Sequence, residues 1–240
     1  MPGDHEAICA RGLVAGYGTH VVLQEASISV GEGDIVSVVG HNGAGKSTLL
    51  KCLFGLLPAQ CGEVEVRGTP VRAPTPARML SLGVALAPQG NRVLSDLTVE
   101  EHLRLATSSI SERTARQHAQ EQALAEFPVL KERRRQKAGT LSGGEKQMLV
   151  IAASLASSPR VLLLDEPTLG LAPSARQQLF RKILTLREER RLSLLIVEQR
   201  VQEIIAVADR ICVLKRGRIA LDSSTADVRL DPAILTTAFL

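Results

Sequence analysis

The sequence predicts an α/β fold built on a mainly parallel sheet, and three observations lead to this prediction. Short apolar, β-branched runs alternate with stretches of helical pattern, as in a parallel sheet with crossover helices. A glycine-rich loop follows one of the strands directly and opens a helix. Residues 91–158 contain no good strand pattern, so we expect a helical insertion that interrupts the α/β core.

The strands are expected where the apolar runs are short and bounded by turn residues. They are Ile8–Val14, Val21–Val30, Ile35–Val39, Glu63–Arg67, Val84–Ala87, Val161–Leu164, Ser193–Val197, Arg210–Leu214 and Arg218–Leu221. Helices are expected to start near Lys46, Thr75, Thr98, Ser111, Ser142, Pro173, Val201 and Ser224. Two of these starts carry a capping box, Thr98 with Glu101 and Ser142 with Glu145.

Composition excludes several classes of function. The 240 residues include only four Phe, one Tyr and no Trp, too few for an aromatic platform that stacks sugars or single-stranded nucleic acid. No apolar run approaches the roughly 18 residues of a membrane span. The polar N-terminus predicts no signal peptide. Cys9, Cys52, Cys61 and Cys212 lack metal-binding spacing, so we expect reduced thiols.

The net charge of +4 permits a weak attraction to anionic surfaces but does not require one. The densest basic run, residues 131–137, is short and contains no aromatic residue. It is therefore interpreted as a solvated helix end rather than a nucleic-acid patch, and no nucleic-acid partner is expected.

A phosphate-binding loop follows the apolar run that ends at Val39. Its strand–loop–helix context is what this motif requires. Backbone N–H groups, a helix N-terminus and the Lys46 charge can converge on a triphosphate, while the Ser47 hydroxyl can bind Mg²⁺. A glycine-rich turn with a solvated lysine is the alternative. The loop is Gly40, His41, Asn42, Gly43, Ala44, Gly45, Lys46, Ser47 and Thr48, which predicts a nucleoside triphosphate as ligand.

Two carboxylates follow the buried strand pattern 161–164. Ligands bind at the carboxyl ends of strands in open α/β sheets, so both side chains are expected at the nucleotide. Asp165 is expected to hold Mg²⁺, and Glu166 to polarise a water for attack on the γ-phosphate. An acidic pair that only caps a helix is the alternative.

A second glycine-containing segment narrows the class of nucleotide-binding protein. In Leu141-Ser142-Gly143-Gly144-Glu145, a serine and two glycines open a helix with exposed N–H groups, a second anion site in a chain that already has one. Here the sequence resembles the ATP-binding subunits of ABC transporters, with Glu145 where their signature most often has Gln. An ordinary capped helix is the alternative. In that family two subunits pair head to tail, so these residues would act on the partner's ATP.

The resemblance extends over roughly residues 7–222. It implies a P-loop NTPase (RecA-like) core with a mixed, mainly parallel sheet, an antiparallel β subdomain and the helical insertion. Tyr17 would stack on adenine, although a turn tyrosine without a ligand is the alternative. Gln89 would reach Mg²⁺ and the attacking water, and the loop 169–172 would cross the dimer interface.

One position departs from the family pattern. A histidine usually follows the strand that corresponds to Ser193–Val197, but this chain has Gln199 there and no histidine after position 118. The Gln199 amide can hydrogen-bond the γ-phosphate but cannot titrate, so Glu166 is favoured as the base. A surface residue at a strand end is the alternative. The Val197-Glu198-Gln199 ending resembles the short ATPase subunits of branched-chain amino acid importers and their urea and amide relatives.

We therefore expect one ATP-binding domain over residues 1–240, with a core at about 5–90 and 159–222, a helical insertion at about 91–158, and a short helix and irregular tail at 223–240. The expected activity is ATP hydrolysis coupled to solute import. Lys46, Glu166 and Gln199 are the expected catalytic residues, and Ser47, Gln89 and Asp165 the expected Mg²⁺ ligands.

The resemblance implies three partners: a second ATPase subunit, identical or paralogous, integral-membrane permeases and, indirectly, a solute-binding protein. It places the chain peripherally at the cytoplasmic face of the inner or plasma membrane. A soluble ABC ATPase outside transport is the alternative, and a small-molecule P-loop kinase a more distant one.

Overall fold

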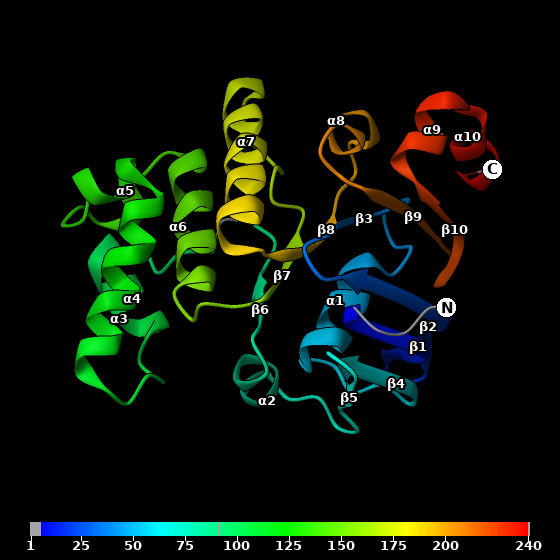
Figure 1. Cartoon of the computed structure of the whole chain (residues 1–240), viewed down its shortest axis with the longest axis horizontal. Coiled ribbons are helices and arrows are strands. Elements are labelled where there is room, and N and C mark those ends of the chain that lie inside the picture. The colour runs from blue at the N-terminus through cyan, green and yellow to red at the C-terminus, as the bar shows by residue number, and fades with distance from the viewer. Residues whose placement is uncertain (1–5, 91, 240) are drawn as a thin grey trace.

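A six-stranded sheet forms the centre of the computed structural model, which describes residues 6–90 and 92–239 (Figure 1). The segment 1–5, where no signal peptide was expected, lies outside the described residues, as do Asn91 and Leu240. The strand order is β10-β9-β3-β8-β7-β6. The strands are β3 (Ile35–Val39), β6 (Val84–Ala87), β7 (Val161–Asp165), β8 (Ser193–Val197), β9 (Arg210–Lys215) and β10 (Arg218–Ser224).

Every pair in this sheet is parallel except β10 with β9. The strands β3, β7 and β8 are buried along their whole length, which explains why their sequences are nearly continuous apolar runs. Their carboxyl ends lie side by side at one edge of the sheet, where the loops that follow them meet. The prediction of a mixed, mainly parallel sheet is confirmed.

A second, antiparallel sheet has the order β2-β1-β4-β5. Its strands are β1 (Glu6–Tyr17), β2 (His20–Gly31), β4 (Cys61–Val66) and β5 (Thr69–Pro70). The tight hairpin between β1 and β2 pairs Tyr17 with His20. Gly16 is required there because a Cβ atom would lie 1.9 Å from the His20 carbonyl oxygen.

All the helices of the core except the last one begin near the expected residues. They are α1 (Lys46–Phe54), α2 (Pro76–Ser81), α7 (Pro173–Arg190), α8 (Val201–Ile205), α9 (Thr225–Leu230) and α10 (Ala233–Phe239). The end of the chain differs from the expected irregular tail, because 233–239 forms a helix whose Leu235 is buried. None of the helices within the described residues is long and apolar enough to cross a membrane.

Helices also fill the segment between β6 and β7, and Figure 1 shows them gathered beside the central sheet. They are α3 (Val99–Ala106), α4 (Arg113–Glu126), α5 (Pro128–Glu132), the 3₁₀ turn η1 (Ala138–Thr140) and α6 (Gly143–Leu155). Both capping boxes predicted from the sequence are present, at Thr98 and Ser142. We call α3 to α6 the helical insertion.

The core lies on both faces of the central sheet, because alternate residues of a strand point to opposite faces. Leu162 and Leu164 of β7 pack in a cluster with α6 and α7, whereas Val161 and Leu163 pack in a second cluster with α1 and the β1–β2 hairpin. Two packed faces hold the strands rigidly and fix the positions of the loops at their carboxyl ends.

Candidate functional site

The phosphate loop joins β3 to the N-terminus of α1. Gly45 caps α1 with φ 109°, a left-handed conformation that glycine adopts without strain. No side chain caps this helix end and no acidic residue lies in its first turn. The end therefore keeps unpaired N–H groups and a positive field, which suits an anion.

The Lys46 side chain is only 4% exposed and lies along this loop. Its Nζ donates hydrogen bonds to the carbonyl oxygens of Gly40 at 2.9 Å and His41 at 3.1 Å. Burial lowers the pKa of Lys46, and the carboxylates of Glu166 and Asp165 oppose that shift. The ammonium is thus a charge held in place by the backbone of the loop where phosphates would bind.

Asp165 ends β7 and meets the first turn of α1. The Ser47 hydroxyl donates to Asp165 Oδ1 at 3.0 Å, which joins two of the predicted Mg²⁺ ligands. Burial raises the pKa of Asp165, and a nearby cation would relieve that cost. The donor set of hydroxyl and carboxylate oxygens fits Mg²⁺, which prefers hard oxygen ligands.

Glu166 lies among the polar side chains described above. It adopts φ 47°, a conformation uncommon outside glycine, and its N–H donates to the Val197 carbonyl of β8 at 2.9 Å. The sheet thereby turns the carboxylate toward the phosphate loop, where Oε1 lies 4.0 Å from Lys46 Nζ.

Two amides hold the Glu166 carboxylate. Gln89 Nε2 donates to Oε2 at 2.7 Å, and Gln199 Nε2 donates to Oε1 at 2.8 Å. The structure thus brings together two glutamines that lie far apart in the sequence, and each occupies one carboxylate oxygen. Each oxygen keeps a second lone pair, so a water molecule that approached Glu166 would share the carboxylate with the two amides.

No sequence pattern assigns a role to Glu198, but in the structure its carboxylate links two loops. Its side chain is 3% exposed, and its Oε1 accepts hydrogen bonds from the Thr168 N–H at 3.0 Å and hydroxyl at 2.7 Å. Its Oε2 accepts the Gln199 N–H at 3.2 Å. Burial raises the pKa of Glu198. This carboxylate joins the loop after β7 to the loop after β8.

These groups surround a pocket of about 460 Å³. The residues that line it are His20, Val22, Asn42, Gly43, Gly45, Lys46, Ser47, Thr48, Gln89, Glu166 and Gln199. His20 and Val22 were not predicted, because they reach the pocket through the fold of the β1–β2 hairpin rather than through a motif. The pocket therefore brings the phosphate loop together with Gln89, Glu166 and Gln199.

Tyr17 lies at the tip of that hairpin, where 48% of its surface is exposed. Lys51 Nζ donates to its hydroxyl at 3.4 Å and lies 5.8 Å from the centre of its ring. The strand pairing places Tyr17 opposite His20, which lines the pocket. Part of the Tyr17 ring remains exposed, as stacking on a planar base requires.

The signature segment lies on α6, in the helical insertion. Leu141 is buried, and Ser142 caps the helix by accepting the Glu145 N–H at 3.3 Å. The Glu145 carboxylate in turn accepts the Ser142 N–H at 2.8 Å. The capping box does not engage the N–H groups of Gly143 and Gly144. N–H groups in the first turn of a helix have no acceptor within that helix. Among the described residues that line the Lys46 pocket, none belongs to this segment.

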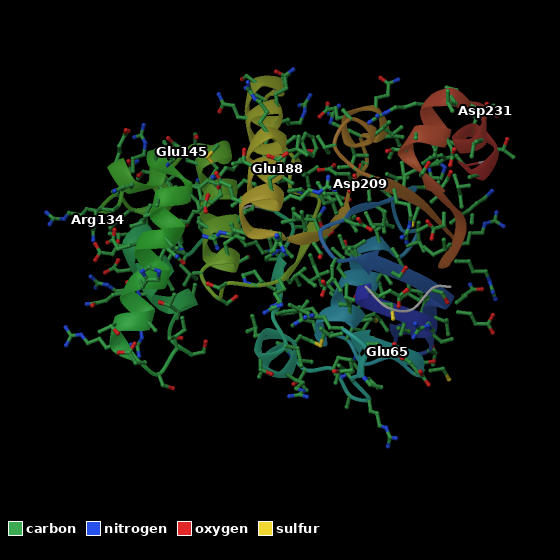
Figure 2. All side chains as sticks on the ribbon, viewed as in Figure 1. Glu65, Arg134, Glu145, Glu188, Asp209 and Asp231 are labelled. Carbon is green, nitrogen blue, oxygen red and sulfur yellow. The ribbon has the colours of Figure 1, made fainter. Side chains whose placement is uncertain are left out.

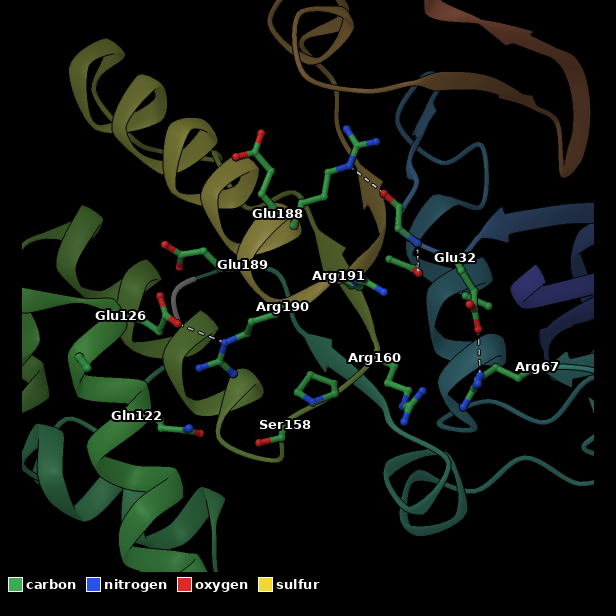
Figure 3. Close-up of a pocket in the computed structure, with 16 residues that line it drawn as sticks. Glu32, Arg67, Gln122, Glu126, Ser158, Arg160, Glu188, Glu189, Arg190 and Arg191 are labelled. Carbon is green, nitrogen blue, oxygen red and sulfur yellow. Dashed lines mark hydrogen bonds and ion pairs between the residues drawn. The ribbon is translucent and has the colours of Figure 1, made fainter. Parts of the chain in front are cut away.

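A larger hollow, of about 1040 Å³, lies at the amino ends of the strands, away from the phosphate loop (Figure 3). Charges of both signs line it, and several pair with each other, such as Arg190 with Glu126 at 3.1 Å and Arg67 with Glu32 at 3.0 Å. Its field is largely compensated, so it is a poor candidate for the nucleotide site despite its size.

Comparison with known proteins gives consistent matches. Residues 23–169 match the protein family described as ABC transporter. The chain is 41% identical over 218 residues to the high-affinity branched-chain amino acid transport ATP-binding protein BraG of Pseudomonas aeruginosa, across 91% of this chain and 93% of the relative. It is 38% identical over 216 residues to the probable branched-chain amino acid transport ATP-binding protein LivF of Archaeoglobus fulgidus, across 90% and 91%.

Solved structures match over almost the whole chain. A nucleotide-free ATP-binding cassette from an ABC transporter superposes with a TM-score of 0.85 at 26% identity, covering 96% of this chain and 97% of that one. The ADP conformation of an ATP-binding cassette gives 0.84 at 27% identity, with the same coverage.

Proposed function

The chain belongs to the ABC transporter family and is an ATP-binding, ATP-hydrolysing subunit. From that premise we propose that it drives the import of branched-chain amino acids or of related small polar solutes such as urea and amides. The two relatives named above support this choice, since both are transport ATP-binding proteins for branched-chain amino acids and align over about nine-tenths of the chain.

One observation carries the mechanism. Lys46 and Glu166 line a single pocket, beside which Asp165 accepts a hydrogen bond from Ser47. Ser142 and its two glycines form a second helix end suited to an anion elsewhere. Each chain thus carries two parts of a phosphate site that lie apart from each other. A second subunit can bring its own part to the other's and complete the site. We propose that two subunits pair head to tail, so that each helix end faces the other's γ-phosphate. Closure is then driven by contacts that exist only in the closed state.

The residues of the pocket have distinct proposed roles. Lys46 and the loop N–H groups hold the phosphates, and Ser47, Asp165 and Gln89 hold Mg²⁺, which neutralises phosphate charge when bound. Glu166 accepts the proton of the attacking water. Gln199 donates a hydrogen bond to the γ-phosphate when released from Glu166. Tyr17 stacks on the adenine.

We propose that permease subunits dock on a groove between the helical insertion and the core. This groove has a volume of about 300 Å³ and is lined mainly by apolar residues, among them Pro88 beside Gln89. Leu80 in the lining, and Leu94 and Leu105 from nearby segments, are exposed large hydrophobic residues. An integral-membrane partner would cover this surface and sense Gln89. We propose that the subunit works in this way at the cytoplasmic face of the membrane.

The test compares two variants in ATP binding and phosphate release. Glu166→Gln keeps the shape of the side chain but removes the base, so it should bind ATP, stall turnover and accumulate an ATP-stabilised dimer. Lys46→Ala should weaken ATP binding itself. Near-normal phosphate release by Glu166→Gln would remove Glu166 from the role of base, and unchanged affinity in Lys46→Ala would contradict the phosphate-loop assignment.

A further inference from the structure

The Glu145 carboxylate creates an electrostatic problem at the signature helix. It is the third residue of α6, at the helix end that we propose receives a partner's γ-phosphate. A carboxylate satisfies the helix N-terminus well in the absence of a ligand. When an anion approaches the same N–H groups, however, that negative charge opposes it.

The structure shows what compensates this charge. Arg133, in the loop after α5, forms an ion pair with Glu145, its Nε lying 2.9 Å from Oε1, while Oε2 accepts the Ser142 N–H. Burial alone would raise the pKa of Glu145, but the Ser142 hydrogen bonds and the Arg133 charge outweigh burial and lower it. The carboxylate is therefore ionised near neutral pH, and both of its oxygens are engaged.

The guanidinium is itself held in place. Arg133 Nη1 donates to Gln136 Oε1 at 3.2 Å, and the Gln136 N–H donates to the Arg133 carbonyl at 2.8 Å. The Glu145 side chain is 17% exposed, so the pair is partly shielded from water before any partner covers it. Figure 2 shows Glu145 on the helical insertion, on the same side of the molecule as Arg134.

We propose that Arg133 is a positioning residue for ATP turnover: it holds the Glu145 carboxylate back on α6 and neutralises it, so that the Gly143 and Gly144 N–H groups can donate to the partner's phosphate. This inference rests on the proposed function, because it needs the signature helix to face a nucleotide of the second subunit. It predicts that Arg133 matters only while residue 145 is negatively charged.

The test is a four-member cycle in the assembled transporter, with ATP turnover measured against ATP concentration. Arg133→Gln should raise the ATP concentration for half-maximal turnover by roughly threefold to tenfold. The double variant should match Glu145→Gln alone, because the effect of Arg133→Gln should disappear once residue 145 carries no charge. If Arg133→Gln impairs turnover equally with Glu145 and with Gln at position 145, or has no effect in the wild-type background, the proposal is overturned.

Two controls establish whether the effect is specific to Arg133 and independent of stability. Arg134→Gln removes a neighbouring arginine that pairs with Glu100 at 3.3 Å within the insertion, and it should leave the ATP dependence unchanged. Thermal unfolding of the nucleotide-free Arg133→Gln chain should shift by no more than a few degrees, since an ion pair whose arginine is 44% exposed contributes little to stability. A large loss of stability with an unchanged ATP dependence would indicate a merely structural role and overturn the proposal.

A third variant separates failure of this inference from failure of the proposed function. Ser142→Phe blocks the helix end whatever Arg133 does. If Ser142→Phe keeps full turnover, the proposed head-to-tail site is wrong. If Ser142→Phe is inactive while Arg133→Gln behaves as wild type, only the role of Arg133 is wrong.

Discussion

Removal of the buried Glu198 carboxylate should destabilise the chain measurably. In Glu198→Ala, Thr168 loses the acceptor of its N–H and hydroxyl, and Gln199 loses the acceptor of its N–H. Thr168 is only 2% exposed, so water does not readily replace the lost partner. Each buried donor left unpaired costs about 1–3 kcal/mol. Relief of the buried charge offsets part of this, and we expect a net loss of about 2–4 kcal/mol.

Thermal unfolding followed by far-UV circular dichroism measures this loss, since the chain has no tryptophan and a single tyrosine. For a chain of this size, about 2–4 kcal/mol corresponds to a fall in Tm of roughly 4–16 °C. Glu198→Gln is the matched control, because its amide oxygen can still accept from Thr168 and only the Gln199 N–H is left facing a donor. A loss below about 1 kcal/mol in Glu198→Ala would refute the reasoning.

The same carboxylate has a pH signature. Burial raises the pKa of Glu198 in the folded chain, so the folded state binds this proton more tightly than the unfolded state. Its contribution to stability is present below the ordinary carboxyl pKa and is lost as pH rises through the raised value. Glu198→Gln should therefore lose less stability than wild type across that interval in pH-dependent unfolding.

Two further predictions concern the contact between Gln199 and Glu166 and the proposed docking surface. Gln199→His introduces a group that titrates near neutrality beside Glu166. Its protonated form should hold the Glu166 carboxylate more firmly, so turnover should fall as pH drops from about 8 to 6, in a limb that the wild-type profile lacks; identical profiles would argue that Gln199 leaves Glu166 before the rate-limiting step. Leu105→Glu, at an exposed position near the apolar groove, should leave the ATPase of the purified subunit intact and weaken its copurification with permease subunits at least severalfold; undiminished copurification would place the docking surface elsewhere.

The sequence predicted the parts of the site that depend on local spacing. The glycines and Lys46 share one short loop, so their proximity follows from a single strand–loop–helix turn. Asp165 and Glu166 follow an apolar strand, which predicts that they lie at the carboxyl edge of a sheet. The contact between Ser47 and Asp165 is then a consequence of two strands ending at the same edge.

The remaining contacts depend on conformations that no local pattern encodes. Glu166 contacts both glutamines from a left-handed φ directly after β7, and the sequence contains no glycine there to signal that conformation. His20 enters the pocket through hairpin packing. At the other end of the chain, α10 is held by tertiary contacts, including the Phe239 ring, whose centre lies 5.5 Å from that of His41. Such a helix is too short to be stable alone, so its sequence gives little indication of it.

The most direct measurement is ATP turnover per chain, recorded in the same buffer in which sedimentation gives the associated fraction, with and without a partner subunit. Because the pocket around Lys46 contains no described signature residue, we expect turnover to follow the associated fraction and to vanish in Ser142→Phe. A strictly monomeric sample that hydrolyses ATP at the full rate, with Ser142→Phe equally active, would contradict the central claim.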